Sequence, residues 1–139
     1  MGMPLFFKRF LLVMIGLLLH SAVYGERWVF VGADTEAKFY VDLDSVLQEN
    51  ENKVFKKRGM YTNVLTDEFN AGEPVVFKIT EATVEMDCTL ELNRVRLLEI
   101  IDEAGNVKWS SGLMPRQLWL SIRDQGHSRT SFDFVCGAK

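Results

Sequence analysis

The sequence predicts an α+β protein, in which a single antiparallel sheet of about six strands carries one short C-terminal helix. Between residues 26 and 122, runs rich in β-branched and aromatic residues alternate apolar with polar side chains. Such alternation is typical of strands with one buried face. After Gly126 the spacing changes, because Phe132 and Val135 lie three residues apart, as on one face of a helix. An antiparallel sheet with a helix at one end belongs to the α+β class.

The N-terminal segment, residues 1–25, has the features of a secretory signal peptide. Lys8 and Arg9 provide a positive start, and residues 10–19 form an apolar run. Spanning a bilayer takes about 20 apolar residues, roughly twice the length of this run. Cleavage is therefore favoured over a retained membrane anchor.

The segment Val23–Gly25 places small or permitted residues where signal peptidase needs them, so we expect a cut before Glu26. No cysteine follows the apolar run, which argues against a lipoprotein. Residues 26–139 are then one domain in the periplasm or outside the cell, with no transmembrane segment after cleavage.

The mature chain reads as short strands separated by turns and loops. The expected strands are residues 28–31, 37–42, 53–62, 75–88, 93–101 and 107–110. The expected connections are a short turn from Asp44 and Ser45 through Leu47, loops at residues 48–52 and 66–74, and a hairpin turn at residues 103–106. Ser128 is the expected N-cap of the helix.

The hairpin around residues 89–92 can be read in more detail. One register pairs Val84 with Leu97, Met86 with Val95, Glu85 with Arg96 and Asp87 with Arg94. It places apolar pairs on one face and opposite charges on the other, which cross-strand pairing favours. The carboxylates of Glu81, Glu85 and Asp87 are then expected on a solvated, partly paired face rather than in a metal or acid–base site.

Cys88 and Cys136 are the two cysteines of the chain. In an exported protein an even number of cysteines indicates a disulfide, and two allow one pairing. Closing so long a loop is worth about 4 kcal/mol in the chain-entropy model. The alternatives are weaker, because the spacing does not match a Cys-x-x-Cys redox motif and one histidine in the mature chain is too few for zinc. We expect a structural disulfide that ties the helix to the apolar face of the sheet.

Several segments of residues 26–139 resemble the surface-adhesin protein E-like domain, a family of small exported proteins of Gram-negative bacteria. The matching segments are Trp28–Gly32, Tyr40–Ser45, Met86–Cys88, Arg94–Leu98, Gly105, Trp119 with Ile122, and Val135–Cys136. Residues 125–128 depart from the Pro-Gly-Ser that the family tends to have before its last helix. The resemblance implies the fold, the disulfide and the compartment, whereas adhesion follows from it only by analogy.

Residues that would carry catalysis are missing from the mature sequence. His127 and Ser128 are adjacent, but a serine nucleophile needs a base that reaches it across space. No phosphate-binding loop, metal-spaced cluster or cofactor motif is present. The net charge of −3 also gives no support for nucleic-acid binding. We therefore expect a non-enzymatic protein without a cofactor.

Basic residues on the third expected strand are the candidate ligand surface, and they are Lys53, Lys56, Lys57 and Arg58. The alternative is a solvated strand edge that lysines protect from aggregation. Exposed aromatic residues are a second candidate, although a core position is the default for each of Tyr61, Phe69, Trp109 and Trp119.

Three functions follow as hypotheses. The first is a binding module of the bacterial envelope whose partner is another envelope protein. The second is an adhesin for host matrix or serum proteins. The third is a small periplasmic hydrolase. The missing lipoprotein cysteine favours the first over the second, because surface display would then need a separate carrier.

Overall fold

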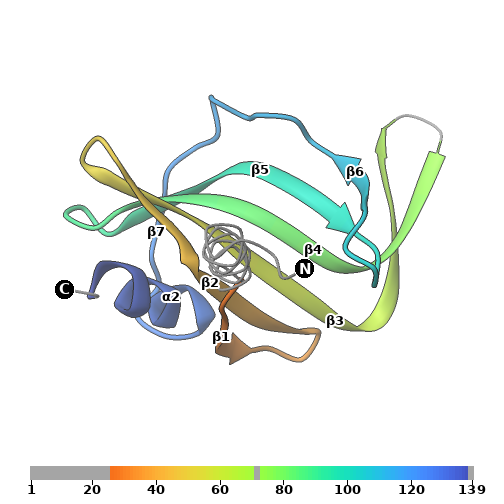
Figure 1. The fold of residues 1–139 in the computed structure, drawn as a ribbon, viewed down its shortest axis with the longest axis horizontal. Helices are drawn as coiled ribbons and strands as arrows, with labels where there is room; N and C mark the ends of the chain where they lie inside the picture. The colour runs from red at the N-terminus through yellow and green to blue at the C-terminus, as the bar shows by residue number, and fades with distance from the viewer. Residues whose placement is uncertain (1–25, 71–72, 138–139) are drawn as a thin grey trace, which may run out of the picture.

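The computed structural model describes residues 26–70 and 73–137, and the predicted signal peptide lies outside them. Figure 1 shows one curved sheet with a short helix packed at one end of it. The elements are β1 (Trp28–Ala33), β2 (Ala37–Glu49), β3 (Asn52–Asn70), β4 (Glu73–Asp87), β5 (Leu92–Ile101), β6 (Val107–Ser110), β7 (Leu120–Ser121) and α2 (His127–Cys136). The predicted single antiparallel sheet and C-terminal helix are confirmed. No helix in the described ranges is long and apolar enough to cross a membrane.

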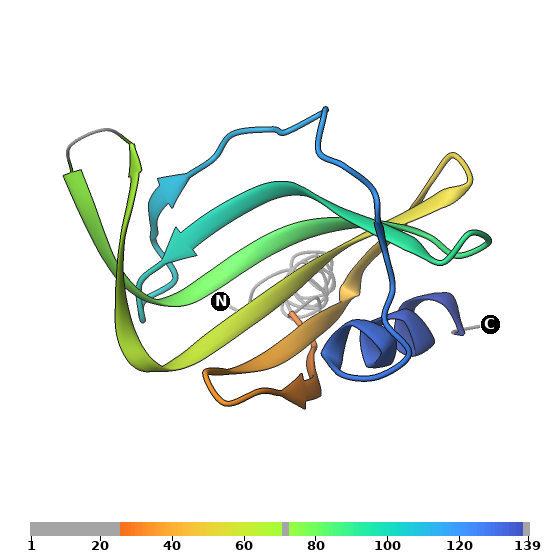
Figure 2. The ribbon, with the colours of Figure 1, turned by 180° about the vertical axis from the view of Figure 1, so that it is seen from behind.

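Strands β1 to β6 lie side by side in chain order, and every pairing is antiparallel. Strand β7 pairs with the start of β5, whereas β6 pairs with its end. Figure 2 shows the intervening segment following the sheet edge from β6 and then descending to α2. Backbone amides of this segment donate to the Leu98 and Arg96 carbonyls of β5. The segment therefore covers part of the β5 edge and delivers the chain to the helix.

Two faces of the sheet differ in character, and the alternation of strand residues assigns each side chain to one of them. The helix-side face carries the core, and α2 packs against it. The core side chains are Val31, Val41, Phe55, Val84, Met86, Ile122 and Val135. We call the opposite side the outer face. Its ionisable residues include Asp42, Lys56, Arg58, Glu81 and Glu85.

The disulfide between Cys88 and Cys136 is present, with 5.6 Å between the two Cα atoms. It joins the turn after β4 to the last residue of α2, as predicted. Val135 beside it is fully buried. The covalent link and the buried valine therefore hold the end of the helix on the core.

The predicted turn at Asp44 and Ser45 is wrong, because β2 continues through both residues. Pairing with β3 is interrupted between Asp42 and Leu47. The Asp44 amide donates to Asp42 Oδ1 at 3.0 Å, and Ser45 Oγ donates to the Asp42 carbonyl at 2.7 Å. Polar side chains that form such local bonds favour turns, but here they satisfy the backbone of a bulge within a strand.

The two predicted loops are also wrong in extent. The loop expected at residues 48–52 is a turn at Asn50 and Glu51, where Asn50 takes a positive φ of 55° that asparagine tolerates. Most of the loop expected at residues 66–74 is strand, since β3 runs to Asn70 and β4 begins at Glu73. We call this paired end of β3 and β4 the arm. Its described side chains at residues 66, 67 and 74 are all exposed, so the sequence there has no apolar alternation that would mark a strand.

The predicted register of the β4–β5 hairpin is wrong. The observed pairs are Val84 with Val95, Glu85 with Arg94, Met86 with Asn93 and Asp87 with Leu92. A bulge between Thr83 and Val84 changes the register, so that Leu97 lies opposite Thr83. Val84, Met86 and Val95 keep their predicted face, but the bulge moves Leu97 to the outer face.

The start of α2 differs from the prediction. The N-cap is Gly126, with φ 91° and no side-chain capping bond, rather than Ser128. A Cβ on Gly32 of β1 would lie 3.2 Å from His127 Cα. The helix therefore begins two residues earlier than predicted and in close contact with β1, which fixes His127 against the sheet.

Candidate binding cleft between the sheet and the helix

A cleft of about 210 Å³ lies between the helix-side face of β2–β5 and the first half of α2. Its apolar walls come from strand residues of the same alternation that builds the core. They include Phe39, Phe55, Val84, Met86 and Val95. Its polar residues include Lys57, Asn93, His127, Ser128 and Ser131. The sheet thus supplies the apolar surface, and α2 with one lysine of β3 supplies most of the polar groups.

Gly59 makes room for one wall of the cleft. A Cβ at this position would lie 2.9 Å from Thr80 Oγ1 and 3.3 Å from a ring carbon of Phe39. With glycine there, the Phe39 ring stacks on the His127 imidazole at a centroid distance of 3.8 Å and an interplanar angle of 18°. Phe39 and Gly59 together therefore set the position of the imidazole.

Lys57 reaches the same imidazole from β3. Its Nζ lies 2.8 Å from His127 Nδ1 and 3.5 Å from the His127 carbonyl oxygen. Burial lowers the pKa of Lys57 to about 8, so the amine is still mostly charged at pH 7. Within the described residues, no carboxylate oxygen lies within 4.0 Å of this nitrogen. The ammonium is solvated by neutral acceptors and by the Phe39 ring, 5.6 Å away.

The His127 imidazole is held in its neutral form. Burial lowers its pKa first, and the positive charges of Lys57 and Arg123 lower it further, while Asp34 opposes them. An ammonium can only donate, so His127 Nδ1 accepts from Lys57 and the ring proton sits on Nε2. The pair is thus a cation and a neutral imidazole that together present N–H donors.

The cleft continues into a wider polar hollow of about 490 Å³. Asn93, His127 and Ser128 line both spaces, and Asp34 and Arg123 line the hollow alone. The amides of Glu36 and Ala37 donate to Asp34 and lower its pKa. A small molecule entering the cleft would therefore pass polar groups before it reaches the apolar wall.

The four predicted basic residues do not form one surface. Lys53 and Lys57 lie on the helix-side face, where Lys53 Nζ donates to the Val135 carbonyl at 2.9 Å. Lys56 and Arg58 lie on the outer face and share the Glu81 carboxylate, at 3.6 Å and 3.0 Å. A ligand role for these residues stays a prediction, but the structure brings them together only in pairs.

The acidic residues of the outer face are paired as expected but less solvated. Glu85 is buried, and it accepts bonds from Arg94 at 2.8 Å and from Asn52 at 2.8 Å. Burial alone would raise the pKa of Glu85, but these bonds and the charges of Arg94 and Arg96 lower it overall. Asp87 instead accepts the amides of the hairpin turn. The prediction of a solvated face is therefore wrong for Glu85.

The aromatic candidates are half-buried where their side chains are described. Tyr61 packs edge-to-face with Phe77, and Trp119 lies 4.3 Å beneath the Arg94 guanidinium. Trp109 is half-buried as well, and the Phe69 side chain lies outside the described residues. None of the three described rings stands free as an exposed anchor.

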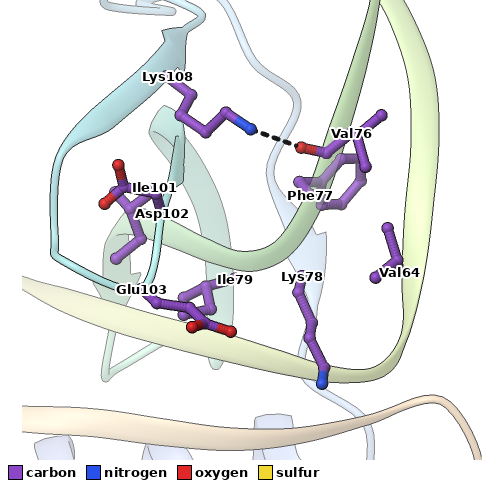
Figure 3. Close-up of a pocket in the computed structure, with 9 residues that line it drawn as sticks. All are labelled: Val64, Val76, Phe77, Lys78, Ile79, Ile101, Asp102, Glu103 and Lys108. Atoms are coloured by element: carbon purple, nitrogen blue, oxygen red, sulfur yellow. Dashed lines mark hydrogen bonds between the residues drawn. The ribbon is translucent and has the colours of Figure 1, made fainter.

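A second pocket, of about 200 Å³, lies at the far end of the sheet under the curled ends of β3 and β4. Figure 3 shows apolar side chains such as Val64, Ile79 and Ile101 in this pocket. Lys108 Nζ crosses to the Val76 carbonyl at 3.0 Å and ties β6 to the arm. This pocket holds no pair of buried ionisable groups in contact, so the cleft beside α2 is the stronger candidate site.

Sequence reasoning missed the contact between Lys57 and His127. It grouped Lys57 with its neighbours in a surface patch and placed His127 in a turn. The alternation Phe55–Lys57–Gly59 puts Lys57 on the apolar face and is a signal that was available. The early start of the helix at His127 carries no comparable signal.

Neither a family model nor a curated protein matches this chain. The likeness to the surface-adhesin protein E-like domain thus stays a prediction from the motifs quoted above.

Proposed function

We propose that this chain is a non-enzymatic binding module of the bacterial envelope and that its ligand occupies the cleft beside α2. The observation that carries the proposal is the cleft itself, a largely apolar cavity with a partly buried ammonium–imidazole contact at its polar side. Concave apolar sites with a few placed polar groups are the usual form of small-molecule sites. The disulfide and the predicted signal peptide support a location outside the cytoplasm.

The surroundings of His127 support binding rather than catalysis. Its Nδ1 is engaged by Lys57, and its ring is stacked on Phe39. The Ser131 hydroxyl donates to the His127 carbonyl oxygen at 2.6 Å and not to the ring. A serine nucleophile would instead need the imidazole as its proton acceptor. The histidine is therefore placed to hold a ligand in position.

Filling the cleft tests the proposal. Ala82 lines the cleft from β4, so Ala82→Leu places extra methylenes in the cavity. Thr83→Leu is the matched control, since it is the next residue of β4 and points to the outer face. The probe is a mixture of small organic acids, amines and neutral aromatic compounds. Its binding is measured by the shifts of backbone amide signals in ¹⁵N NMR spectra.

Wild type and Thr83→Leu should show ligand-dependent shifts at Phe39, Lys57 and His127, and folded Ala82→Leu should lose them. Shifts that survive in Ala82→Leu, or a wild type that no probe perturbs, would overturn the proposal for the cleft. Fractionation of a Gram-negative host should recover the protein from the periplasm, and recovery only from the cytoplasm would overturn its envelope half.

A further inference from the structure

The charge of Lys57 has no anionic partner within the described residues. The other cationic groups near the helix-side face are compensated or solvated: Lys53 donates to a backbone carbonyl, and Arg129 pairs with Glu91 at 2.7 Å. Lys57 faces Phe39, His127 and the cavity instead. A buried charge without a counterion is unfavourable, so an anion in the cleft would relieve an existing cost.

Hydrogen-bond donors at this point suit a group with two acceptor oxygens. The Lys57 ammonium has three N–H bonds, of which one is used at 2.8 Å and a second only weakly at 3.5 Å. His127 Nδ1 takes one of these bonds, and the ring's Nε2–H is directed away from Lys57, so the remaining N–H bonds of the ammonium are the donors for an anion. Asn93 and Ser128 line the same part of the cleft. A carboxylate accepts bonds through both oxygens and matches this set.

The remainder of the cleft limits the rest of the ligand. Phe39, Ala82 and Val95 are apolar lining residues that stay partly exposed, so the bound molecule needs an apolar body to cover them. A volume of about 210 Å³ has room for roughly seven to ten non-hydrogen atoms. Inorganic anions lack the apolar part, and a protein segment or glycan chain is too large to enter.

We infer that the cleft binds a small apolar carboxylate, with its carboxylate at Lys57 and its hydrocarbon part against Phe39, Ala82 and Val95. This inference rests on the proposed function and specifies the ligand class of the same site. Recognition comes from the pairing of one partly buried cation with one anion, and affinity comes from the apolar wall.

Titration calorimetry with three compounds of equal chain length tests the inference: hexanoate, hexanol and hexylamine. Hexanoate should bind wild type at least tenfold more tightly than hexanol, and hexylamine should not bind. Lys57→Met should bring hexanoate down to the level of hexanol. Lys56→Met is the matched control on the outer face, and its hexanoate affinity should equal that of wild type.

Proton uptake gives a second readout. Lys57 is about half protonated near pH 8, and a bound carboxylate favours its charged form. Hexanoate binding at pH 8 should therefore take up as much as about half a proton, measured in two buffers of different ionisation enthalpy. The uptake should disappear in Lys57→Met and persist in Lys56→Met.

The outcomes separate this inference from the proposed function. If hexanoate and hexanol bind with equal affinity, and Lys57→Met changes neither affinity, the carboxylate class is wrong and the cleft binds apolar molecules in general. Hexanoate binding that survives Ala82→Leu would place the carboxylate outside the cleft and overturn the inference. If none of the three compounds binds but other probes shift the NMR signals of cleft residues, the inference is wrong and the proposed function stands. If no compound binds and no probe shifts these signals, both proposals are wrong.

Discussion

The two faces of β3 treat neighbouring lysines in opposite ways. Lys56 lies on the outer face, with its side chain 47% exposed and its Nζ 3.6 Å from a Glu81 oxygen. Lys57 lies on the helix-side face, where burial lowers its pKa to about 8 and its close contact is a neutral imidazole. Outer-face charges thus occur in opposite pairs, and the helix-side face holds a cation without one.

The difference shows that a run of consecutive basic residues in a strand does not predict one basic surface. Successive strand side chains point to opposite faces, so adjacent lysines enter different environments. The outer face satisfies its own charges, and an added anion would compete there with Glu81. On the helix-side face no carboxylate of the described residues lies within 4.0 Å of Lys57 Nζ to compete with an anion there. The helix-side face, whose sequence pattern is mainly apolar, is therefore the face on which binding of an anion would be selective.

The largest effect we expect comes from releasing the helix that creates the helix-side environment. Replacing Cys88 or Cys136 by serine should lower the free energy of unfolding by about 2–5 kcal/mol, because the link restricts the unfolded chain and fastens α2 to the core. Urea denaturation of each variant and of wild type measures this. Because loss of the disulfide loosens α2 from the sheet and exposes Lys57, it should also raise the pKa of Lys57 towards its ordinary value of 10.5.

A loss below about 1 kcal/mol would mean that packing of Val135 alone holds the helix, since typical native disulfides contribute more. An unchanged Lys57 pKa in a destabilised variant would separate the cleft from the disulfide. Reduced wild-type protein serves as the control, because it removes the same bond without changing a residue.

Features with a strong local signal could be predicted from the sequence. The alternation of Ala37, Phe39 and Val41 identifies the buried face, and it depends on nothing beyond the strand itself. The disulfide follows from two cysteines in a chain that is predicted to be exported. The end of the helix follows from Val135 and Cys136. Each of these rests on spacing within a single element or on a single permitted pairing.

Features set by bulges and by docking could not be predicted in the same way. The bulge beside Thr83 changes the hairpin register, and the irregular stretch after Asp42 turns an apparent loop into strand. The contact between Lys57 and His127 joins residues 70 positions apart. It depends on where α2 begins against Gly32, and tertiary packing decides that position rather than local propensity.

A smaller effect is expected where a paired charge of the outer face is removed. Glu85→Gln should lower stability by about 1–3 kcal/mol, because Arg94 and Asn52 lose a buried, charged acceptor. The folded pKa of Glu85 is lowered, so its contribution is present at neutral pH and is lost as the pH falls through that pKa. Denaturation of both proteins at pH 7 and in acid measures it, and the difference should shrink in acid. Equal stability at pH 7 would show that the outer-face pair contributes nothing.

An effect of opposite sign is expected from Lys57→Met. Removing a cation that has no anionic partner should raise stability at pH 7 by about 1–2 kcal/mol, although loss of the His127 contact offsets part of the gain. The unfolded amine titrates near 10.5 and the folded amine near 8, so the unfolded chain binds more protons between these values. Wild-type stability should therefore rise through this pH window, and the advantage of Lys57→Met should fade by its upper end.

Lys56→Met completes the comparison, since it removes the same charge one residue away. Glu81 keeps Arg58 at 3.0 Å when Lys56 is lost, and the pair it loses is half exposed. Stability should change by less than about 0.5 kcal/mol at every pH between 7 and 10.5. If Lys56→Met and Lys57→Met gave the same curve of stability against pH, the two faces would not differ electrostatically. A rise confined to proteins that retain Lys57 would assign the cost to the helix-side face, where a bound anion has a charge to neutralise.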